Sequence, residues 1–244
     1  MKTGIIGALP EEIQFLLQEL HHSGKKVTET RRGSMEFTEG EIRNNAVVVC
    51  RCGVGKVHAA MCAQILISEF GVTRIINTGA AGALDSRLSL FDIVVSTEAV
   101  QHDFNVTPFG YEPACIPGFN SPFFVADPDL REVAKKGFER VLANFPGGAP
   151  TPSIYEGRIA TGDVFVAENS LRAEIVERFF PACVEMEGAA IAQVCATFGI
   201  PFVILRSISD LADNSADSTY DEYSEKVSVM SAMLIVEMLA LLDS

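Results

Sequence analysis

Short apolar runs recur along the chain at the lengths expected of buried strands. Residues 2–9, 72–78, 92–100, 154–161 and 201–209 are rich in Val, Ile and Ala and carry few charges. Runs of this length and composition predict strands whose two faces are both covered. Residues 33–41 and 45–52 predict a hairpin.

Apolar residues at helical intervals fill the stretches between these runs. Pro10 suits the first turn of a helix, and Ile13, Leu16 and Leu20 follow it at helical spacing. Further helices are predicted at residues 53–70, 129–145, 187–198 and 219–242. Strands alternating with helices predict an α/β fold, with a mixed, largely parallel twisted sheet flanked by helices. Because no repeat or linker is evident, residues 1–244 are expected to form a single domain.

Residues suited to chemistry fall where such sheets bind ligands, beyond the carboxyl ends of strands. Glu12 follows the first strand, Asp210 follows the strand at 201–209, and a predicted turn of small residues at 79–83 follows the strand at 72–78. The small-residue turns at 53–56 and 79–83 lack the P-loop and dinucleotide spacings. Either turn could lie against a ligand, or could merely allow tight packing of a helix on a strand.

Two other segments are predicted to be irregular. Residues 102–124 form a long predicted loop rich in Pro, Gly and aromatic residues, and loops of this length are more often functional than idle. His102 lies there and is the histidine of most interest, because His21 and His22 are expected at an exposed helix end. Residues 146–152 predict a surface connection. No nucleophilic triad and no G-x-S-x-G elbow is found.

Charge and hydropathy narrow the classes of partner. Apolar residues make up 48% of the chain, as in a folded globular protein, and the formal net charge is −13. So acidic a surface argues against nucleic acid and against a basic membrane-surface helix. The N-terminus lacks signal-peptide features, and residues 227–242 are shorter than the about 20 residues that span a bilayer. A cytoplasmic location without a membrane or nucleic-acid partner is expected.

The six cysteines predict no metal site. Cys50 and Cys52 are the only close pair, and their spacing matches no zinc template. On one strand they would share a face and act as small buried hydrophobes. No metal and no cofactor are expected.

Three acids could meet at one edge of the sheet although they are far apart in sequence. Glu12, Glu187 and Asp210 would supply what glycosidic-bond cleavage needs: a proton donor, an activator of water and a group that supports a developing oxocarbenium ion. Each acid also has an ordinary interpretation. Glu12 and Glu187 could be favoured by a helix dipole, and Asp210 could be a strand-end cap.

Seven motifs in one order carry a resemblance that covers nearly the whole chain. They are Gly4-Ile5-Ile6-Gly7-Ala8 with Glu11-Glu12, Gly53-Val54-Gly55-Lys56-Val57, Asn77-Thr78-Gly79-Ala80-Ala81-Gly82, His102-Asp103 with Phe109-Gly110-Tyr111, Thr161-Gly162-Asp163-Val164-Phe165, Val184-Glu185-Met186-Glu187 and Arg206-Ser207-Ile208-Ser209-Asp210. The series resembles the 5′-methylthioadenosine/S-adenosylhomocysteine nucleosidases of the nucleoside phosphorylase superfamily. A nucleoside phosphorylase-like fold is therefore expected.

The resemblance implies a role for each acid. Asp210 would protonate N7 of adenine, Glu12 would activate the attacking water, and Glu187 would bind the ribose hydroxyls. The implied reaction is hydrolysis of the N-glycosidic bond of 5′-methylthioadenosine and S-adenosylhomocysteine to adenine and the thioribose, with 5′-deoxyadenosine as a further candidate substrate. Burial would raise the pKa of Asp210 and so allow it to carry a proton at neutral pH.

The resemblance also implies a set of binding residues around these acids. Phe165 would stack on the purine, the backbone of Val166 would read its edge, and Val106 and Phe109 would reach across a homodimer interface to cover the 5′ tail. The remaining residues would line or support the pocket: Leu9, Val54, Ala80, Ala81, Gly82, Glu185, Met186, Arg206, Ser209 and Tyr220.

Three alternatives differ in reaction or class. A purine nucleoside phosphorylase would replace water by phosphate, but Glu11 and Glu12 would repel an anion and Ile75-Ile76-Asn77 lacks the arginine expected before the small-residue turn. A futalosine-type nucleosidase would keep hydrolysis and change the 5′ group. A non-catalytic nucleoside-binding module would not need all three acids. The family commonly has serine at Ala80 and often methionine at Leu9, so specificity for the tail stays open.

Overall fold

Four parallel strands form the centre of the molecule. The structure is a computed structural model that describes residues 1–144, 151–213 and 216–242. In it, β1 (Lys2–Gly7) pairs with β4 (Asn45–Arg51) and β5 (Arg74–Ala83), and β5 pairs with β10 (Phe202–Asp210). All nine residues of β10 are buried, which explains why its first four residues, 202–205, are apolar without alternation. The carboxyl ends of these strands meet at one edge of the sheet.

The other strands close one side of the sheet and extend the other. β6 (Ile93–Gln101), β8 (Ile154–Thr161) and the short β9 (Cys183–Glu185) connect β10 back to β5, so that five strands form a ring. β3 (Met35–Ile42) and β2 (Thr28–Arg32) continue antiparallel from β4, and β7 (Phe123–Val125) pairs with β6. The expected mixed sheet is confirmed, with its parallel pairs at the centre and in β6–β8–β9.

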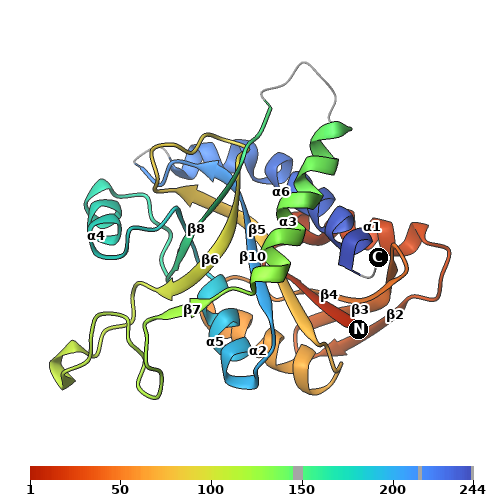
Figure 1. Ribbon diagram of the computed structural model, residues 1–244, viewed down its shortest axis with the longest axis horizontal. Helices are drawn as coiled ribbons and strands as arrows, with labels where there is room; N and C mark the ends of the chain where they lie inside the picture. Colours follow the sequence, from red (N-terminus) through yellow and green to blue (C-terminus); the bar gives the residue numbers. More distant parts are fainter. Residues whose placement is uncertain (145–150, 214–215, 243–244) are drawn as a thin grey trace.

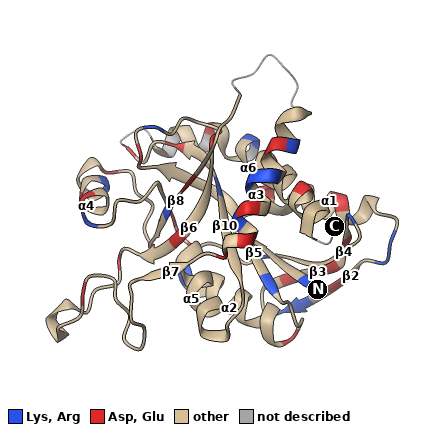
Figure 2. Cartoon of the chain, viewed as in Figure 1, with Lys and Arg blue, Asp and Glu red and all other residues tan. Residues whose placement is uncertain are grey.

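Helices cover both faces of the sheet, as the apolar strands require (Figure 1). α1 (Pro10–His22), α3 (Pro128–Ala143) and α6 (Ala216–Leu242) pack together on one face, and α2 (Lys56–Ser68) and α5 (Gly188–Phe198) pack on the other. α4 (Asn169–Phe179) lies apart, beside β8. Figure 2 shows acidic and basic residues interspersed along α3, where Lys135 forms an ion pair with Glu132.

One element was predicted wrongly and several were missed. Residues 79–83 form no turn, because β5 continues through them and pairs with β10 and β9. β2, β7, β9 and α4 were not predicted. β2 is a polar, mostly exposed edge strand, and β7 and β9 have only three residues each. The last predicted residue of the 129–145 helix, and residues 146–150 of the predicted surface connection, lie outside the described residues.

The structure agrees with what was expected of the long loop, two cysteines and two histidines. Residues 102–122 form a long loop whose one helical turn is η1 (Thr107–Phe109). Cys50 and Cys52 are buried, and His21 and His22 are exposed at the end of α1. Within the described residues, no helix is long and apolar enough to cross a membrane.

Candidate active site

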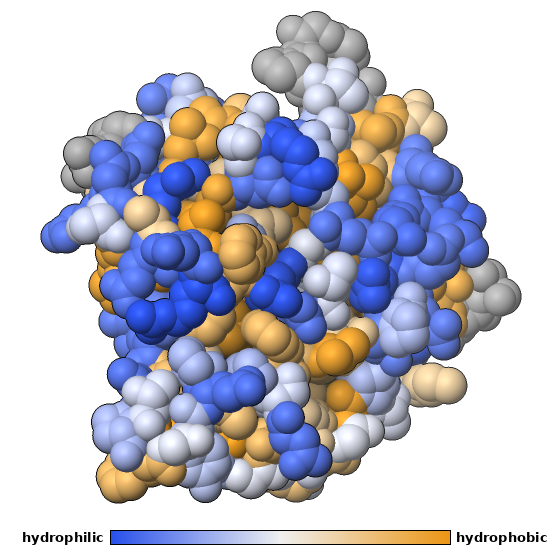
Figure 3. Space-filling view, turned by 60° about the vertical axis from the view of Figure 1, so that its left-hand side comes forward, coloured by the Kyte–Doolittle hydropathy of each residue, from blue (hydrophilic) through white to orange (hydrophobic). Residues whose placement is uncertain are grey.

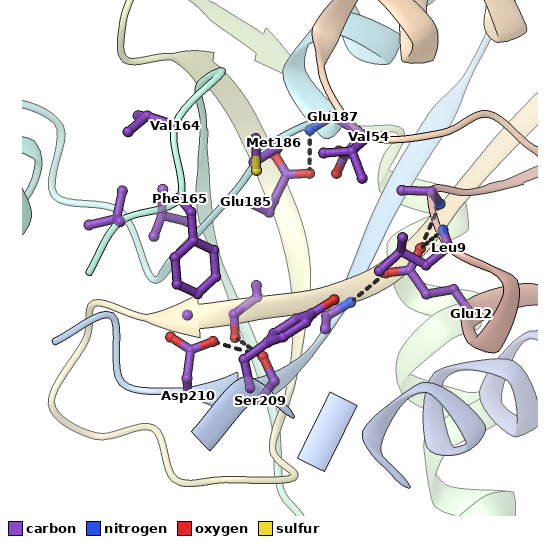
Figure 4. Close-up of a pocket in the computed structure, with 17 residues that line it drawn as sticks. Leu9, Glu12, Val54, Val164, Phe165, Glu185, Met186, Glu187, Ser209 and Asp210 are labelled. Atoms are coloured by element: carbon purple, nitrogen blue, oxygen red, sulfur yellow. Dashed lines mark hydrogen bonds between the residues drawn. The ribbon is translucent and has the colours of Figure 1, made fainter. Parts of the chain in front are cut away.

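A cavity of about 410 Å³ opens beyond the carboxyl ends of β1, β5 and β10 (Figure 4). It brings together 14 of the 17 candidate residues, which come from seven separate segments of the chain. The lining residues are Ala8, Leu9, Glu12, Val54, Ala80, Ala81, Gly82, Val164, Phe165, Val166, Val184, Glu185, Met186, Glu187, Ser209, Asp210 and Tyr220.

Glu12 is held at one end of the cavity by backbone N–H groups. It is the third residue of α1, and its Oε2 atom accepts hydrogen bonds from Ala8 N (2.5 Å) and Leu9 N (3.0 Å). Its Oε1 atom accepts a third bond from Ala80 N on β5 (3.2 Å). Burial raises the pKa of Glu12, although the charge of Arg206 and these N–H donors oppose the rise. The carboxyl is therefore fixed in direction and can hold or release a proton.

Asp210 ends β10 on another side of the cavity, below Phe165 in Figure 4. Ser209 Oγ donates to its Oδ2 atom (2.9 Å) and Ala212 N donates to its Oδ1 atom (2.8 Å). Its pKa is raised by burial, against the effect of these two hydrogen bonds. The β5–β10 pairing shifts register between Ile208 and Asp210. This irregularity lets the consecutive residues Ser209 and Asp210 both face the cavity, which a regular strand would not allow.

Two glycines on β5 make room for the two acids. A Cβ atom on Gly79 would lie 2.6 Å from Glu12 Oε1, and one on Gly82 would lie 2.6 Å from Asp210 Oδ1. Distances this short leave no space for any side chain. The small residues of this segment are thus explained by the close approach of two carboxyl groups to the β5 backbone.

Glu187 lies at the start of α5, where it is 7% exposed. Gly55 N, at the start of α2, donates a hydrogen bond of 2.8 Å to its Oε1 atom. Burial, with the neighbouring charge of Glu185, raises the pKa of Glu187 to about 8, while Arg206 opposes this rise. One oxygen of this carboxyl is thereby fixed by the protein.

Glu185 and Arg206 form a buried ion pair that supports the wall of the cavity. Glu185 Oε2 accepts from Arg206 Nη2 and from the N–H groups of Glu187 (3.0 Å) and Gly188 (2.7 Å), and Thr161 Oγ1 donates to its other oxygen. Arg206 also donates to Asn77 Oδ1 (2.7 Å). Arg206 does not line the cavity; it lies behind it and acts as a support.

Aromatic and aliphatic side chains form the rest of the wall. Phe165 is 44% exposed, and its ring meets the ring of Tyr220 edge to face at 5.9 Å. In Figure 4 Phe165 stands above Asp210, while Leu9 and Val54 lie toward the opposite end near Glu12 and Glu187. The cavity therefore has one end with an aromatic ring above an acid, and another end with two acids beside aliphatic groups.

Sequence reasoning missed part of the wall and named three residues that do not line it: Arg206, Val106 and Phe109. Ala8, Val164 and Val184 line the cavity, and each stands in a quoted motif next to a residue that was predicted. Val106 and Phe109 do not line the cavity of their own chain, which neither supports nor contradicts their expected role in a partner's site. Among the described residues, no group of three or more His, Cys, Asp or Glu could hold a metal ion.

Comparison with known proteins agrees with this geometry. The model of the phosphorylase superfamily matches residues 2–240. The 5′-methylthioadenosine/S-adenosylhomocysteine nucleosidase of Exiguobacterium sp. is 40% identical over 237 residues, which cover 97% of this chain and 96% of that protein. The chain belongs to this nucleosidase family. It is therefore an N-glycosyl hydrolase.

Two solved structures extend the comparison. A nucleosidase of this family from Colwellia psychrerythraea, solved in complex with adenine, has a TM-score of 0.91 and 39% identity, covering 99% of this chain and 96% of that one. The futalosine hydrolase of Helicobacter pylori has a TM-score of 0.90 and 33% identity, covering 99% and 98%. The nucleosidase fold is thus shared by enzymes whose names give different substrates.

Proposed function

We propose that this nucleosidase hydrolyses the N-glycosidic bond of 5′-methylthioadenosine and S-adenosylhomocysteine and releases adenine. One observation carries the proposal: a single cavity holds two buried acids, Glu12 and Asp210, that are fixed by separate sets of donors and whose pKa values are both raised by burial. Hydrolysis needs one group that gives a proton and one that takes a proton, and such a pair supplies both.

Asp210 is the proposed general acid. A neutral purine leaves poorly, so its N7 atom must gain a proton as the bond from the ribose C1′ to N9 breaks and its electron pair goes to the base. The raised pKa keeps Asp210 protonated to higher pH than an exposed aspartate. After the transfer, the carboxylate is stabilised by the donors Ser209 and Ala212.

Glu12 is the proposed base. Water attacks C1′ as the adenine departs, and one proton of that water passes to the Glu12 carboxylate. Its three backbone donors hold the carboxylate still without supplying a competing proton of their own. A well-placed acid or base contributes roughly 10²- to 10⁴-fold in rate.

The remaining roles concern binding. Glu187 is proposed to accept hydrogen bonds from the ribose hydroxyls through the oxygen that Gly55 does not fix. Phe165 is proposed to stack on the purine above Asp210, since an exposed ring at the base end of a cavity offers a flat apolar surface. Leu9 and Val54, at the other end, would contact the ribose and the 5′-thio tail.

The charge of the lining favours water over phosphate as the nucleophile. Among the described residues that line the cavity, the ionisable side chains are acids and Tyr220, with no Lys, Arg or His. Arg206 lies behind the wall and is engaged by Glu185 and Asn77. A phosphate ion would therefore meet carboxylates without a cation to hold it, and such an arrangement repels an anion.

A futalosine-type nucleoside is the second candidate substrate. The observation that favours it is the TM-score of 0.90 with the Helicobacter pylori futalosine hydrolase, close to the 0.91 of the Colwellia nucleosidase. Both candidates use the same acids and differ in the group at the 5′ end. Parallel assays of the two nucleosides under identical conditions separate them.

A homodimer is also proposed, in which Val106 and Phe109 of one subunit cover the 5′ tail of the substrate bound in the partner's cavity. Phe109 is 81% exposed, and Val57 and Met61 on α2 are 70% and 51% exposed. Figure 3, which brings α4 and the long loop forward, shows hydrophobic side chains reaching the surface among hydrophilic ones. An interface between subunits would remove these apolar side chains from water. Sedimentation analysis tests the dimer, and Phe109→Ala should then raise KM without separating the subunits.

The first experiment measures adenine release from 5′-methylthioadenosine by chromatography, in phosphate-free buffer and with phosphate added. Equal release is expected, and release only with phosphate would overturn hydrolysis. Asp210→Asn should lose turnover by about 10²-fold or more and still bind the nucleoside. Asp85→Asn is the matched control, because it makes the same Asp-to-Asn replacement at a half-buried residue outside the cavity that pairs with Arg87.

A further inference from the structure

Three loops that each lead to a proposed binding residue are joined at one point outside the cavity. The junction consists of Lys56, Asp103 and Asp163. Lys56 opens α2, Asp103 begins the long loop after β6, and Asp163 follows β8. None of the three lines the cavity.

Asp103 receives both of its hydrogen bonds from the other two residues. Lys56 Nζ donates to Asp103 Oδ1 (2.6 Å), and Asp163 N donates to Asp103 Oδ2 (2.9 Å). Lys56 N donates to Asp163 Oδ1 (2.8 Å), which closes the triangle. Although burial alone would raise it, the pKa of Asp103 is lowered by these donors, so the group is a carboxylate at neutral pH. With a side chain only 26% exposed, the ion pair is partly shielded from solvent.

Two arms of the triangle continue into the cavity of the same chain, and the third leads to residues proposed for the partner's cavity. Gly55, next to Lys56, donates to the ribose acid Glu187. Phe165, the proposed purine stacker, is two residues beyond Asp163. The loop that Asp103 begins carries Val106 and Phe109. Two of these segments approach so closely that a Cβ atom on Gly55 would lie 3.0 Å from Asp163 Oδ1.

We infer that Asp103 is a positioning residue that sets the ribose-binding, base-stacking and tail-covering loops relative to one another through its two hydrogen bonds. The inference rests on the proposed function of this cavity. The catalytic groups are held elsewhere: Glu12 by Ala8, Leu9 and Ala80, and Asp210 by Ser209 and Ala212. Disturbing Asp103 should therefore weaken binding and leave the chemical step nearly unchanged.

Asn substitutions at Asp103 and Asp163 separate the positioning role from charge. In Asp103→Asn, the amide NH₂ would face a donor whichever way it turns, because both carboxylate oxygens accept from N–H groups. In Asp163→Asn, the amide oxygen can still accept from Lys56 N. Both variants remove one negative charge from nearly the same place, so a difference between them reports the hydrogen bonds.

The expected result is that Asp103→Asn raises KM for 5′-methylthioadenosine about tenfold with kcat changed less than about threefold, while Asp163→Asn leaves KM within about threefold. Lys56→Met should raise KM like Asp103→Asn, and the double variant should be no worse than either alone. Tm is measured for each variant, because a merely structural role would lower Tm without separating KM from kcat.

Two outcomes would overturn the inference: equal KM values for Asp103→Asn and Asp163→Asn, or additive effects in the double variant. Asp210→Asn is assayed beside them. If Asp210→Asn kept full turnover, the proposed function would be wrong whatever Asp103→Asn does. If Asp210→Asn is inactive and the two Asn variants are alike, the positioning role alone fails.

Discussion

Gly82 and Asp210 stand so close that a single added methyl group at Gly82 would collide with the carboxyl group. The Cβ atom would lie 2.6 Å from Oδ1 and 2.9 Å from the Cβ atom of Ala212, the residue whose N–H holds that same oxygen. The position of the acid is therefore determined by a strand opposite it as much as by its own.

Gly82→Ala is expected to lower kcat by about 10²-fold, because Asp210 must move and general acid catalysis depends on its position. Steady-state kinetics with 5′-methylthioadenosine measures the loss. Gly4→Ala is the control on β1, since its Cβ atom would meet side-chain carbons of Leu66 and Val72 at 3.2 to 3.4 Å. Unchanged kcat in Gly82→Ala, with the protein folded, would contradict this account.

The architecture and the three acids could be predicted from sequence because each rests on local pattern. Buried parallel strands are apolar throughout, and their carboxyl ends collect ligand-binding residues. Glu12 lies in the first turn of the helix after β1, and Asp210 ends β10, so their positions near one edge follow from the element order.

The details that tune the acids could not be predicted, because they depend on contacts distant in sequence. Gly79 and Gly82 read as a turn, yet they belong to a strand that makes room for Glu12 and Asp210. Nothing local indicates the register shift that lets Ser209 face the cavity beside Asp210. The family resemblance implied that Arg206 supports the pocket, but no local pattern indicates that Glu185 engages it.

Ser209→Ala should change the pH profile in a direction fixed by its hydrogen bond. Burial raises the pKa of Asp210, and the Ser209 hydroxyl opposes the rise. Activity falls as pH rises through the pKa of a general acid, because the proton needed at N7 is lost. Without the hydroxyl, this alkaline limb of kcat/KM should move to higher pH. An unmoved or lowered limb would argue that Asp210 is not the acid.

Glu12 should determine the acidic limb of the pH profile of kcat/KM. A base works only when deprotonated, so activity rises as pH rises through its pKa, which burial places above the ordinary value of 4.5. Glu12→Gln should lower kcat by about 10²-fold or more and remove this acid limb. A pH titration of kcat/KM for both proteins checks it. Retention of the limb in the variant would assign it to another group.

Phe165→Ala should weaken nucleoside binding. Stacking of a base on an aromatic side chain contributes about 1–3 kcal/mol by alanine substitution, so KM is expected to rise roughly 5- to 150-fold. Phe165→Tyr keeps the ring, so its KM should stay near that of the parent protein. The same comparison with free adenine as an inhibitor tests whether the loss lies at the base. An effect on KM without any effect on adenine inhibition would move Phe165 away from the purine.

Glu187 should make the folded protein less stable as pH rises. Burial, with the charge of Glu185, raises its pKa to about 8 in the folded state, whereas an exposed glutamate titrates near 4.5. The folded state therefore holds this proton more tightly, and the stabilisation present below about pH 4.5 is lost as pH rises through about 8.

Glu187→Gln is neutral throughout, and its amide oxygen can still accept from Gly55 N. Chemical denaturation should show the variant more stable than the parent by about 1 kcal/mol or more at pH 8.5, with the difference shrinking toward pH 5. Glu29→Gln, on the exposed strand β2, is the control for loss of one charge. A stability difference for Glu187→Gln that does not grow with pH would show that this carboxyl does not titrate between those values.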